Sequence, residues 1–367
     1  MNKRWLRRLD YTLIVATLAI IVISLITIGS ATHINAEGGD RYWFVMRQGI
    51  FAVLNIALAA LLMNFDYKAL HAQGKNLYIF NLVMLLAVLL IGQSALGAQR
   101  WIALGPIAIQ PSEFSKIIMI ICLATMLEER VGKLHTLSDL LPLLAYIGVP
   151  FLLVMKQPDL GTSLVFIAIF LGMIFVSGVN LRILAGGFLA GIAAMPFLWH
   201  GLKDYQKMRL KVFMDPSVDP LGSGYHIIQS KIAIGSGLLF GKGLFEGTQS
   251  QLNFLPENHT DFIFAVVGEE MGFFGATFLL VLYLIVLWRG IIIARDASDT
   301  FGRLLATGIT SMLAFHILVN VGMTTGIMPV TGIPLPLMSY GISSLTTNIL
   351  SITILLNIHM KKQRLQF

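Results

Sequence analysis

The sequence is poor in charged residues. Asp, Glu, Lys and Arg make up 12% of the 367 residues, whereas hydrophobic residues make up 56% and the mean hydropathy is +0.79. A soluble domain of this length could not keep so much apolar surface away from water. The composition therefore excludes a soluble globular protein and predicts an integral membrane protein.

The sequence has one cysteine, Cys122, which lies inside an apolar run. A single cysteine excludes a disulfide or a cysteine metal site within one chain, and we expect an ordinary buried core residue. The sequence also lacks a Walker loop, a dinucleotide-binding fingerprint and the His/Cys spacing of zinc sites. Its basic residues form short clusters between apolar runs rather than one polar face. We therefore expect no organic cofactor and no nucleic acid partner, despite the net charge of +7.

Long apolar runs are what the sequence does contain. Each is close to the length that a hydrocarbon layer of about 30 Å requires of a helix. The runs are 11–28, 45–63, 76–92, 112–127, 139–155, 162–178, 181–199, 262–288, 303–325 and 341–359. The first is longer than a signal-peptide core and is expected to remain as a spanning helix. The sequence thus predicts an all-α polytopic membrane protein, one domain over residues 1–367 with about ten transmembrane helices.

The basic residues predict the orientation of these helices. An even number of spans places both ends of the chain on one side, and the basic ends, residues 3–8 and 361–364, mark that side as cytoplasmic. The outer face then carries a long loop, residues 200–261, between the seventh and eighth helices. A connection of that length without a role would be unusual, so we expect the function at the outer face.

A polar stretch at the end of the long loop is the first candidate site. Glu257, Asn258, His259, Thr260 and Asp261 directly precede an apolar helix. In one interpretation, Thr260 or Asp261 is an N-cap that accepts backbone N–H bonds at the start of the helix. Capping needs only one such side chain, and apolar walls can raise the pKa of a carboxylate, so a reaction site is the alternative.

Charged residues inside apolar runs are further candidates. A charged side chain near the centre of a membrane-spanning helix costs at least about 2.5–3.5 kcal/mol unless it is paired or hydrated. Glu113 and Lys116, at i and i+3, can form an ion pair that either braces the helix or contacts a substrate. Arg100 and Trp101 combine a guanidinium suited to a phosphate with an aromatic ring that prefers the membrane interface.

Two short helices are expected within the long loop. Residues 201–213 predict a basic amphipathic helix that faces lipid headgroups or binds an anion, and residues 225–239 predict a second helix that carries Lys231. The basic residues of the first helix are Lys203, Lys207, Arg209 and Lys211.

Four residues near the start of the eighth run form a separate pattern. Gly268 and Gly272 predict a face of small residues for close helix packing. Glu269 and Glu270 lie two turns inside the same run, and the sequence leaves their role open.

Six blocks of sequence resemble the signature segments of the SEDS family, the shape, elongation, division and sporulation proteins. They are GAQRWI (97–102), QPSEFSK (110–116), QPDLGTS (157–163), DPLGSGYHIIQSKIAIGSG (219–237), GTQSQLNFLPENHTDFIFAVVGEEMG (247–272) and GIPLPLMSYGISS (332–344). The blocks span most of the chain in order. The segment FLPENHTDFIFAV is more similar to elongation-type members than to division-type members.

The resemblance implies a ten-helix peptidoglycan glycosyltransferase of the bacterial cytoplasmic membrane. Such a protein polymerises lipid II at the outer face, together with a class B penicillin-binding protein of the elongation machinery. The family's proposed catalytic aspartate maps onto Asp261. Its functionally sensitive Arg-Trp pair maps onto Arg100 and Trp101, and its Glu/Lys pair onto Glu113 and Lys116.

Glycosyl transfer needs a base for the acceptor hydroxyl and stabilisation of the departing pyrophosphate. Asp261 suits the first role, and His259 is a further candidate for substrate binding. Arg100, Lys116, Lys231 or a divalent cation such as Mg²⁺ or Mn²⁺ could serve the second role. The sequence does not identify a metal ligand set.

Two other classes of function stay open at this point. A flippase or transporter of the lipid-linked precursor would also need intramembrane charges and broken helices, but not a carboxylate at the outer mouth. A scaffold that only recruits the penicillin-binding protein would not depend on the polar residues of the site.

Overall fold

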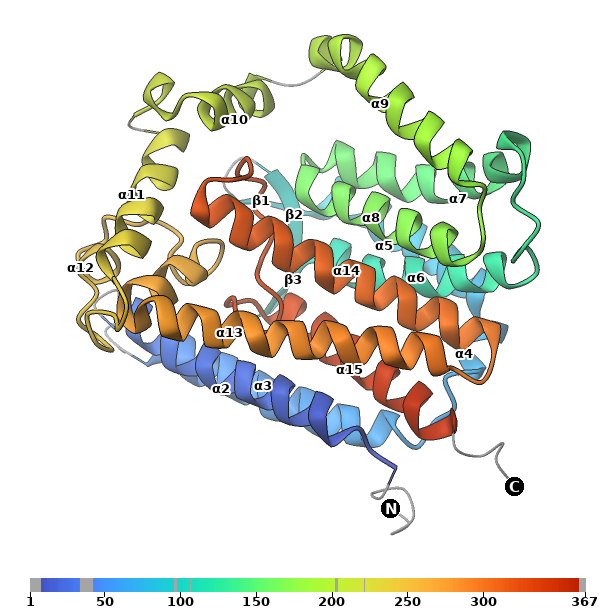
Figure 1. Ribbon diagram of the computed structural model, residues 1–367, viewed down its shortest axis with the longest axis horizontal. Coiled ribbons are helices and arrows are strands. Elements are labelled where there is room, and N and C mark those ends of the chain that lie inside the picture. The colour runs from blue at the N-terminus through green and yellow to red at the C-terminus, as the bar shows by residue number, and fades with distance from the viewer. Residues whose placement is uncertain are drawn as a thin grey trace.

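The apolar runs fold into helices that lie side by side in one bundle (Figure 1). The computed structural model describes residues 8–33, 42–95, 98–105, 107–201, 204–220 and 222–362. A helix covers each of the ten runs expected from the sequence. These helices are α2 (Tyr11–Thr32), α3 (Trp43–Leu62), α5 (Gly74–Ile91), α6 (Pro111–Glu128), α7 (Leu137–Lys156), α8 (Leu160–Val176), α9 (Leu181–Gly201), α13 (Ile263–Asp296), α14 (Thr300–Thr325) and α15 (Ile342–Lys362).

Within the described residues, seven helices are both long enough and apolar enough to cross a membrane: α2, α3, α5, α7, α13, α14 and α15. Helices α8 and α9 contain shorter apolar stretches, and α6 carries three charged residues, Glu113, Lys116 and Glu128. The all-α polytopic membrane fold is therefore confirmed. The count of ten spans stays a prediction.

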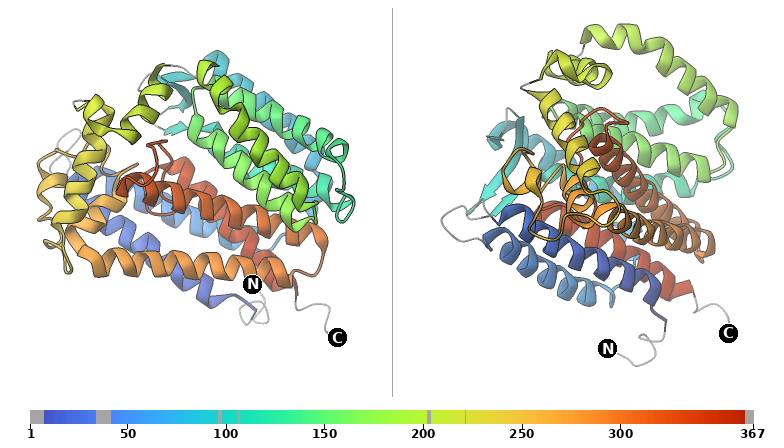
Figure 2. Two further views of the ribbon diagram at one scale, coloured as in Figure 1. Left: turned by 45° about the horizontal axis from the view of Figure 1, so that its top comes forward. Right: turned by 60° about the vertical axis from the view of Figure 1, so that its left-hand side comes forward.

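Helix α14 lies at the centre of the bundle, where it packs against α13, α8 and α6 (Figures 1 and 2). Helix α13 also packs on α2, and α15 packs on α3. Most of the residues of α14 are buried, including the polar residues His316 and Asn320. The central helix thus brings polar side chains into the core, where they need partners.

Helix α9 differs from the other long helices because it projects away from the bundle (Figures 1 and 2). Ile183 and Leu184 in its first turn are partly buried against the core. Most of its later residues are exposed.

The long loop folds mainly into short helices. They are α10 (Asp204–Met214), the 3-10 helix η2 (Pro216–Val218), α11 (Ser223–Ser236) and α12 (Thr248–Gln251). Both helices expected within the loop are present, as α10 and α11. They lie toward the end of the bundle where α13 begins, and α11 packs beside α13 (Figure 1).

A small antiparallel sheet, which the sequence did not predict, precedes α6. Its strands are β1 (Gln93–Ala95), β2 (Ala98–Leu104) and β3 (Ile107–Ile109), in the order β1-β2-β3. Strands of three residues are too short to show an alternating apolar pattern, so the segment resembled a Gly-rich loop. Strand β2 carries both Arg100 and Trp101.

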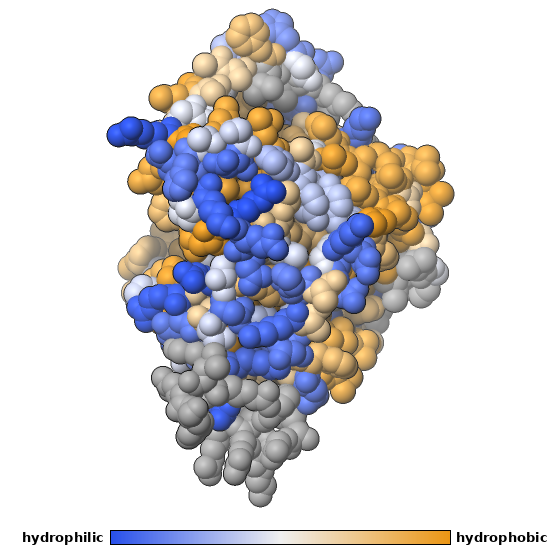
Figure 3. Space-filling view, turned by 90° about the vertical axis from the view of Figure 1, so that its right-hand side faces the viewer, coloured by the Kyte–Doolittle hydropathy of each residue, from blue (hydrophilic) through white to orange (hydrophobic). Residues whose placement is uncertain are grey.

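The opposite end of the bundle is polar and holds the start of α2 and the end of α15 (Figure 1). Ion pairs join its elements, including Asp10 with Arg289 at 2.6 Å and Asp66 with Lys361 at 2.6 Å. The short helix α4 (Ala69–Ala72) also lies here. Figure 3 views the molecule from this end, where hydrophilic residues gather and hydrophobic ones lie mostly toward the edge.

Candidate functional site

A cavity of about 500 Å³ lies at the end of the bundle that carries the sheet and the long loop. Residues from the sheet, from α3, α6, α8 and α10, from the segment before α13 and from the α14–α15 connection line it. Five of the residues predicted from the sequence are among them: Arg100, Trp101, Glu113, His259 and Asp261. The fold therefore brings together residues that are up to 161 positions apart in the chain.

The backbone around Asp261 is fixed by α14 and by the α14–α15 connection. The Asn320 side chain donates one hydrogen bond to the Asp261 carbonyl at 2.9 Å and another to the Ile333 carbonyl at 2.8 Å. Ser339 donates its hydroxyl to the Thr260 carbonyl at 2.6 Å. These bonds hold the segment before α13 against α14 and the α14–α15 connection. They engage backbone carbonyls and do not involve the Asp261 carboxylate.

The N-cap interpretation of Thr260 and Asp261 is wrong. Helix α13 has Phe262 as its N-cap, with no side-chain cap hydrogen bond. The Thr260 hydroxyl instead donates to a Glu257 carboxylate oxygen at 2.8 Å. Within the described residues, no hydrogen-bond donor engages the Asp261 carboxylate, which lines the cavity. A carboxylate without a structural partner is available for chemistry.

Burial raises the pKa of the Asp261 carboxyl to about 6 from its ordinary value of 3.8. The negative charges of Glu257 and Asp159 also raise it, whereas the positive charges of Arg209 and Arg100 lower it. A carboxylate with a pKa near 6 is a stronger base than a solvated one, yet it remains mostly ionised at pH 7. The environment thus suits proton abstraction.

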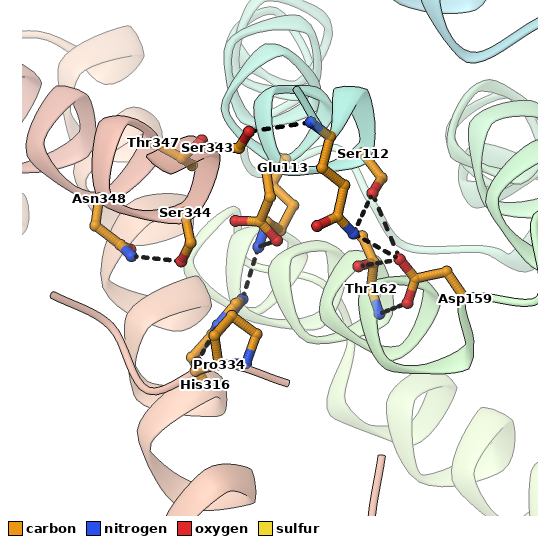
Figure 4. A network of polar contacts seen from close by, with 12 residues as sticks. Ser112, Glu113, Asp159, Thr162, His316, Pro334, Ser343, Ser344, Thr347 and Asn348 are labelled. Atoms are coloured by element: carbon orange, nitrogen blue, oxygen red, sulfur yellow. Dashed lines mark hydrogen bonds and ion pairs between the residues drawn. The ribbon is translucent and has the colours of Figure 1, made fainter. Parts of the chain in front are cut away.

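A chain of polar contacts leads from the cavity into the core (Figure 4). Lys116, which is almost fully buried, donates to Glu113 Oε1 at 2.7 Å, and its Nζ lies 3.1 Å from His316 Nε2. An ammonium group can only donate, so Nε2 accepts and the imidazole is neutral, with its proton on Nδ1. That Nδ1 lies 3.2 Å from the Pro334 carbonyl and donates to it. The predicted Glu113–Lys116 pair therefore exists, and His316 is a third member that the sequence did not suggest.

Arg100 is held by the turn between α7 and α8. Its guanidinium donates to the Pro158 carbonyl and, at 3.4 Å, to the Gln157 carbonyl. Its Nη1 lies 3.8 Å from Asp159 Oδ1. Asp159 in turn caps α8 by accepting from the Thr162 backbone N–H at 3.1 Å (Figure 4). The turn thus fixes the direction of the guanidinium at the cavity wall.

Aromatic residues form another wall of the cavity. The rings of Phe44, His259 and Tyr340 form a cluster: the Phe44 centroid lies 4.9 Å from His259 and 5.0 Å from Tyr340, and the centroids of the last two lie 5.7 Å apart. Trp43 stacks under the Arg47 guanidinium, which is 4.8 Å from the ring centroid. Flat apolar surfaces beside a few charged groups are typical of sites that bind and orient an organic ligand.

Comparisons with known proteins agree with this site. The family model of the cell cycle proteins FtsW, RodA and SpoVE matches residues 11–364. The chain belongs to this family. The resemblance to the SEDS proteins is thereby confirmed.

Individual relatives extend over nearly the whole chain. Peptidoglycan glycosyltransferase MrdB of Escherichia coli K12 is 41% identical over 358 residues, which cover 97% of this chain and 95% of the relative. Stage V sporulation protein E of Bacillus subtilis 168 is 40% identical over 355 residues, 95% of this chain and 96% of the relative.

Two solved structures share the fold. One, described as showing the coordination of polymerization and crosslinking by a peptidoglycan synthase complex, matches with a TM-score of 0.82 and 31% identity, over 97% of this chain and 99% of that chain. The rod shape determining protein RodA of Thermus thermophilus matches with a TM-score of 0.72 and 28% identity, over 97% and 98%.

In this member of the FtsW/RodA/SpoVE family, Lys231 does not line the cavity. It packs against Gly326, whose backbone is so close that an added Cβ would lie 2.0 Å from Lys231 Cε. Gly326 is the left-handed C-cap of α14, and a lysine there complements the negative end of the helix dipole. The geometry gives no support to the predicted contact between Lys231 and substrate.

Arg209 is a lining residue that the sequence did not single out. It belonged to the basic stripe of the expected amphipathic helix, which was expected to face lipid headgroups rather than to bind a specific anion. The structure turns Arg209 of α10 toward the cavity, while Lys203 lies outside the described residues. The sequence of the basic stripe does not indicate which of its residues faces the cavity, because segments far away in the chain form the rest of the cavity.

The lining carboxylates do not form a metal site by themselves. In the part of the chain that the structure describes, no group of three or more His, Cys, Asp or Glu side chains is arranged to hold a metal ion. The divalent cation expected from the sequence stays a prediction.

Replacing Arg100 by lysine should impair the activity of the site although the net charge is unchanged. A lysine has a single Nζ and cannot donate to both carbonyls of the turn while facing the cavity. Loss of one charge-assisted hydrogen bond, worth about 1.5–3 kcal/mol, corresponds to at least about tenfold in activity. Steady-state rates of Arg100→Lys and Arg100→Ala measure this. Full activity of the lysine variant beside an inactive alanine variant would reduce Arg100 to a point charge.

Proposed function

We propose that this protein is a peptidoglycan glycosyltransferase that polymerises lipid II during cell elongation, with Asp261 as the general base. One observation carries the proposal: Asp261 is a cavity carboxylate with a pKa near 6 and without a hydrogen-bond partner among the described residues, in a chain whose relatives are peptidoglycan glycosyltransferases. The same cavity holds Arg47, Arg100 and Arg209, so it contains both a base and positive charge for a phosphorylated substrate.

The reaction assigns a distinct role to each group. Asp261 takes the proton from the acceptor's 4-hydroxyl as that oxygen attacks the anomeric carbon of the donor. The bond between the anomeric carbon and the lipid pyrophosphate breaks, and the electron pair leaves with the pyrophosphate. Arg100 and Arg209 stabilise the negative charge that develops there. The product is a glycan longer by one disaccharide, with Asp261 protonated until water removes the proton.

The remaining lining residues orient the sugars in this proposal. His259, Phe44 and Tyr340 offer flat surfaces, and Trp101 lies beside Arg100 on the same strand. Glu113 presents a carboxylate to the cavity while Lys116 neutralises it from behind. We assign Lys116 to positioning rather than to direct contact with the pyrophosphate.

We further propose that both termini are cytoplasmic and that the cavity faces the outer side of the cytoplasmic membrane. The start of α2 and the end of α15 lie at the bundle end opposite the cavity (Figure 1), and the basic residues 3–8 and 361–364 flank them in the sequence, which supports this orientation. A class B penicillin-binding protein of the elongation machinery is the proposed partner. The similarity to a peptidoglycan synthase complex that couples polymerization to crosslinking supports that assignment.

The direct test is polymerisation by the purified protein. The chain is reconstituted with lipid II, with and without the class B penicillin-binding protein and with Mg²⁺ or Mn²⁺, and glycan strands are resolved on a gel. Polymer that depends on Asp261 supports the proposal. Transbilayer movement of lipid II without polymer would indicate a flippase, and polymer that appears only through the partner, whatever the state of Asp261, would indicate a scaffold.

The rate of polymerisation should fall as the pH drops through about 6. The base must be ionised, so with a pKa near 6 the rate should decrease about tenfold for each pH unit below that value. An ordinary carboxyl, at 3.8, would leave the rate flat down to about pH 5. Burial lowers the pKa of His226, whose ring stacks on Phe262. His226→Gln is therefore the control, and its rate should still fall as the pH drops through about 6.

Two neighbouring charges should shift the acid limb, the pH range in which the rate falls on acidification, in opposite directions. Arg209 lowers the pKa of Asp261, so Arg209→Gln should shift the limb to higher pH. Glu257 raises that pKa, so Glu257→Gln should shift the limb to lower pH. A limb that stays in place in both variants would assign the titration to a group other than Asp261.

A further inference from the structure

Helix α13 is interrupted at Gly272, where φ is +64° and the backbone is not helical. Such a break leaves N–H and C=O groups on both sides without partners in the helix. Residues 238–243 supply them. Phe273 N–H donates to the Leu238 carbonyl at 2.9 Å, and Lys242 N–H donates to the Glu269 carbonyl at 3.0 Å. We call residues 238–243 the sealing segment.

Glycines allow this close approach. An added Cβ on Gly272 would lie 2.2 Å from the Gly241 nitrogen, and one on Gly237 would lie 1.9 Å from the Gly268 carbonyl oxygen. The predicted close helix packing is confirmed at Gly268, where an added Cβ would lie 3.1 Å from Ile234 of α11. Gly272 is not helical and lies against the sealing segment rather than against a helix.

The sealing segment turns its polar side chain inward and its apolar side chains outward. Lys242 pairs with the fully buried Glu269 at 2.8 Å, which settles a role for this glutamate. Leu238 and Phe240 are 78% and 79% exposed. The Phe240 ring lies 5.3 Å from the ring of Phe274, which is itself exposed on α13. This is the reverse of the pattern expected for a loop in water.

Two contacts between α2 and α13 indicate how deep the sealing segment lies in the membrane. At the polar end of the bundle, Asp10 pairs with Arg289 at 2.6 Å. At the cavity end, Ser30 donates to Glu270 at 2.5 Å. The helix from Asp10 to Ser30 rises about 30 Å, which matches the thickness of the hydrocarbon layer. The level of Ser30 and Glu270 is therefore the hydrocarbon boundary on the cavity side.

We propose that the sealing segment is immersed in the membrane, with Leu238, Leu239 and Phe240 among the acyl chains just below that boundary. Irregular backbone survives at such a depth only where the protein satisfies its hydrogen bonds, as the break in α13 is satisfied here. The exposed apolar residues also continue directly into the lipid-facing side of α13, at Phe274 and Leu284. Part of the long loop is thus a re-entrant element rather than an external one.

The immersed segment would determine how far Asp261 stands from the hydrocarbon layer. Helix α13 begins at Ile263, and its straight part up to Gly272 rises about 15 Å. Because the sealing segment holds Gly272 just below the boundary, Asp261, two residues before Ile263, lies at most about 20 Å above Gly272. The height of the cavity above the hydrocarbon layer then depends on the contact of the sealing segment with lipid, and not on the loop helices alone.

The chain's single cysteine makes a site-specific test simple. Cys122→Ser removes the buried thiol, and Phe240→Cys then carries a nitroxide label. In nanodiscs of phosphatidylethanolamine and phosphatidylglycerol, collisions of the label with oxygen and with a water-soluble nickel chelate are measured. Leu284→Cys on the lipid-facing side of α13 and Val218→Cys in η2, which is exposed outside the helix bundle, are the matched controls.

The label at residue 240 should behave like the one at residue 284, accessible to oxygen and protected from the nickel chelate. Accessibility to the chelate equal to that of residue 218 would overturn the proposal, because the segment would then lie in water. Protection from both reagents would also overturn it, because a second copy of the chain or another protein would cover the patch. Leu239→Cys, one residue earlier, serves if the first variant does not fold.

Discussion

Asp261→Asn should abolish most of the polymerisation of lipid II while leaving the protein folded. General-base catalysis contributes at least about 10²-fold to a rate, and an amide cannot take up the acceptor's proton at neutral pH. The substitution keeps the size of the side chain. The hydrogen bond from Asn320 reaches the Asp261 backbone carbonyl and is unaffected. The thermal midpoint in detergent should therefore stay at or above the native value, because a partly desolvated charge is removed.

A second carboxylate of the same cavity provides the matched control. Glu257→Gln removes one negative charge next to Asp261 but keeps an oxygen that can accept from the Thr260 hydroxyl. This variant should polymerise at a rate within a few-fold of the native protein at pH 7, where Asp261 is ionised in both. Binding of lipid II to the Asp261→Asn variant should persist. Near-native polymerisation by that variant would show that Asp261 is not the base.

The helices could be predicted from the sequence because each apolar run is long and continuous. A lipid-facing helix needs apolar residues on its outer side, and a packed one needs them on its inner side, so the signal does not depend on tertiary context. The strands around Arg100 could not be predicted, since their residues pair only within a compact turn at the bundle end. Nor could the break at Gly272, because its cause is the sealing segment rather than the local sequence.

The site was predictable only where residues adjacent in sequence carry its chemistry. Asp261 and His259 share one loop, Arg100 and Trp101 one strand, and Glu113 lies one helical turn from Lys116. His316 and Asn320 are different, because single polar residues in a long apolar helix do not indicate what they contact. Their partners, Lys116 and the Asp261 carbonyl, are brought next to α14 only by packing.

The buried Glu113–Lys116 pair is asymmetric. Glu113 borders the cavity but is itself almost fully buried, and its buried Oε2 has no hydrogen-bond partner within the described residues. Lys116 is almost fully buried, with Glu113 as its only counter-ion recorded there and the neutral His316 as its other partner. Removing either member leaves a charge behind. The charge on Glu113 borders the cavity and is therefore closer to water than the charge on Lys116, which does not border it.

Glu113→Gln should therefore destabilise the protein more than Lys116→Met does. Loss of the carboxylate leaves a buried ammonium without a counter-ion, which costs about 3 kcal/mol or more in the free energy of unfolding. The double variant should lose less stability than the sum of the two single losses, because it strands no charge. Unfolding by titration with sodium dodecyl sulfate measures these free energies, and the same samples are assayed for polymerisation. Strictly additive losses would mean that the two residues do not interact.

Activity separates a structural pair from one that also contacts substrate. Because Glu113 borders the cavity and its buried Oε2 has no partner among the described residues, we expect a small movement of the side chain to let Oε2 accept a hydrogen bond from a hydroxyl or amide of the substrate. The double variant should then recover stability but stay at least about tenfold less active than the native protein, as expected for one lost hydrogen bond to a charged group. An increase in KM for lipid II, with kcat nearly unchanged, would place this contact in substrate binding. Recovery of both stability and activity would make the pair purely structural.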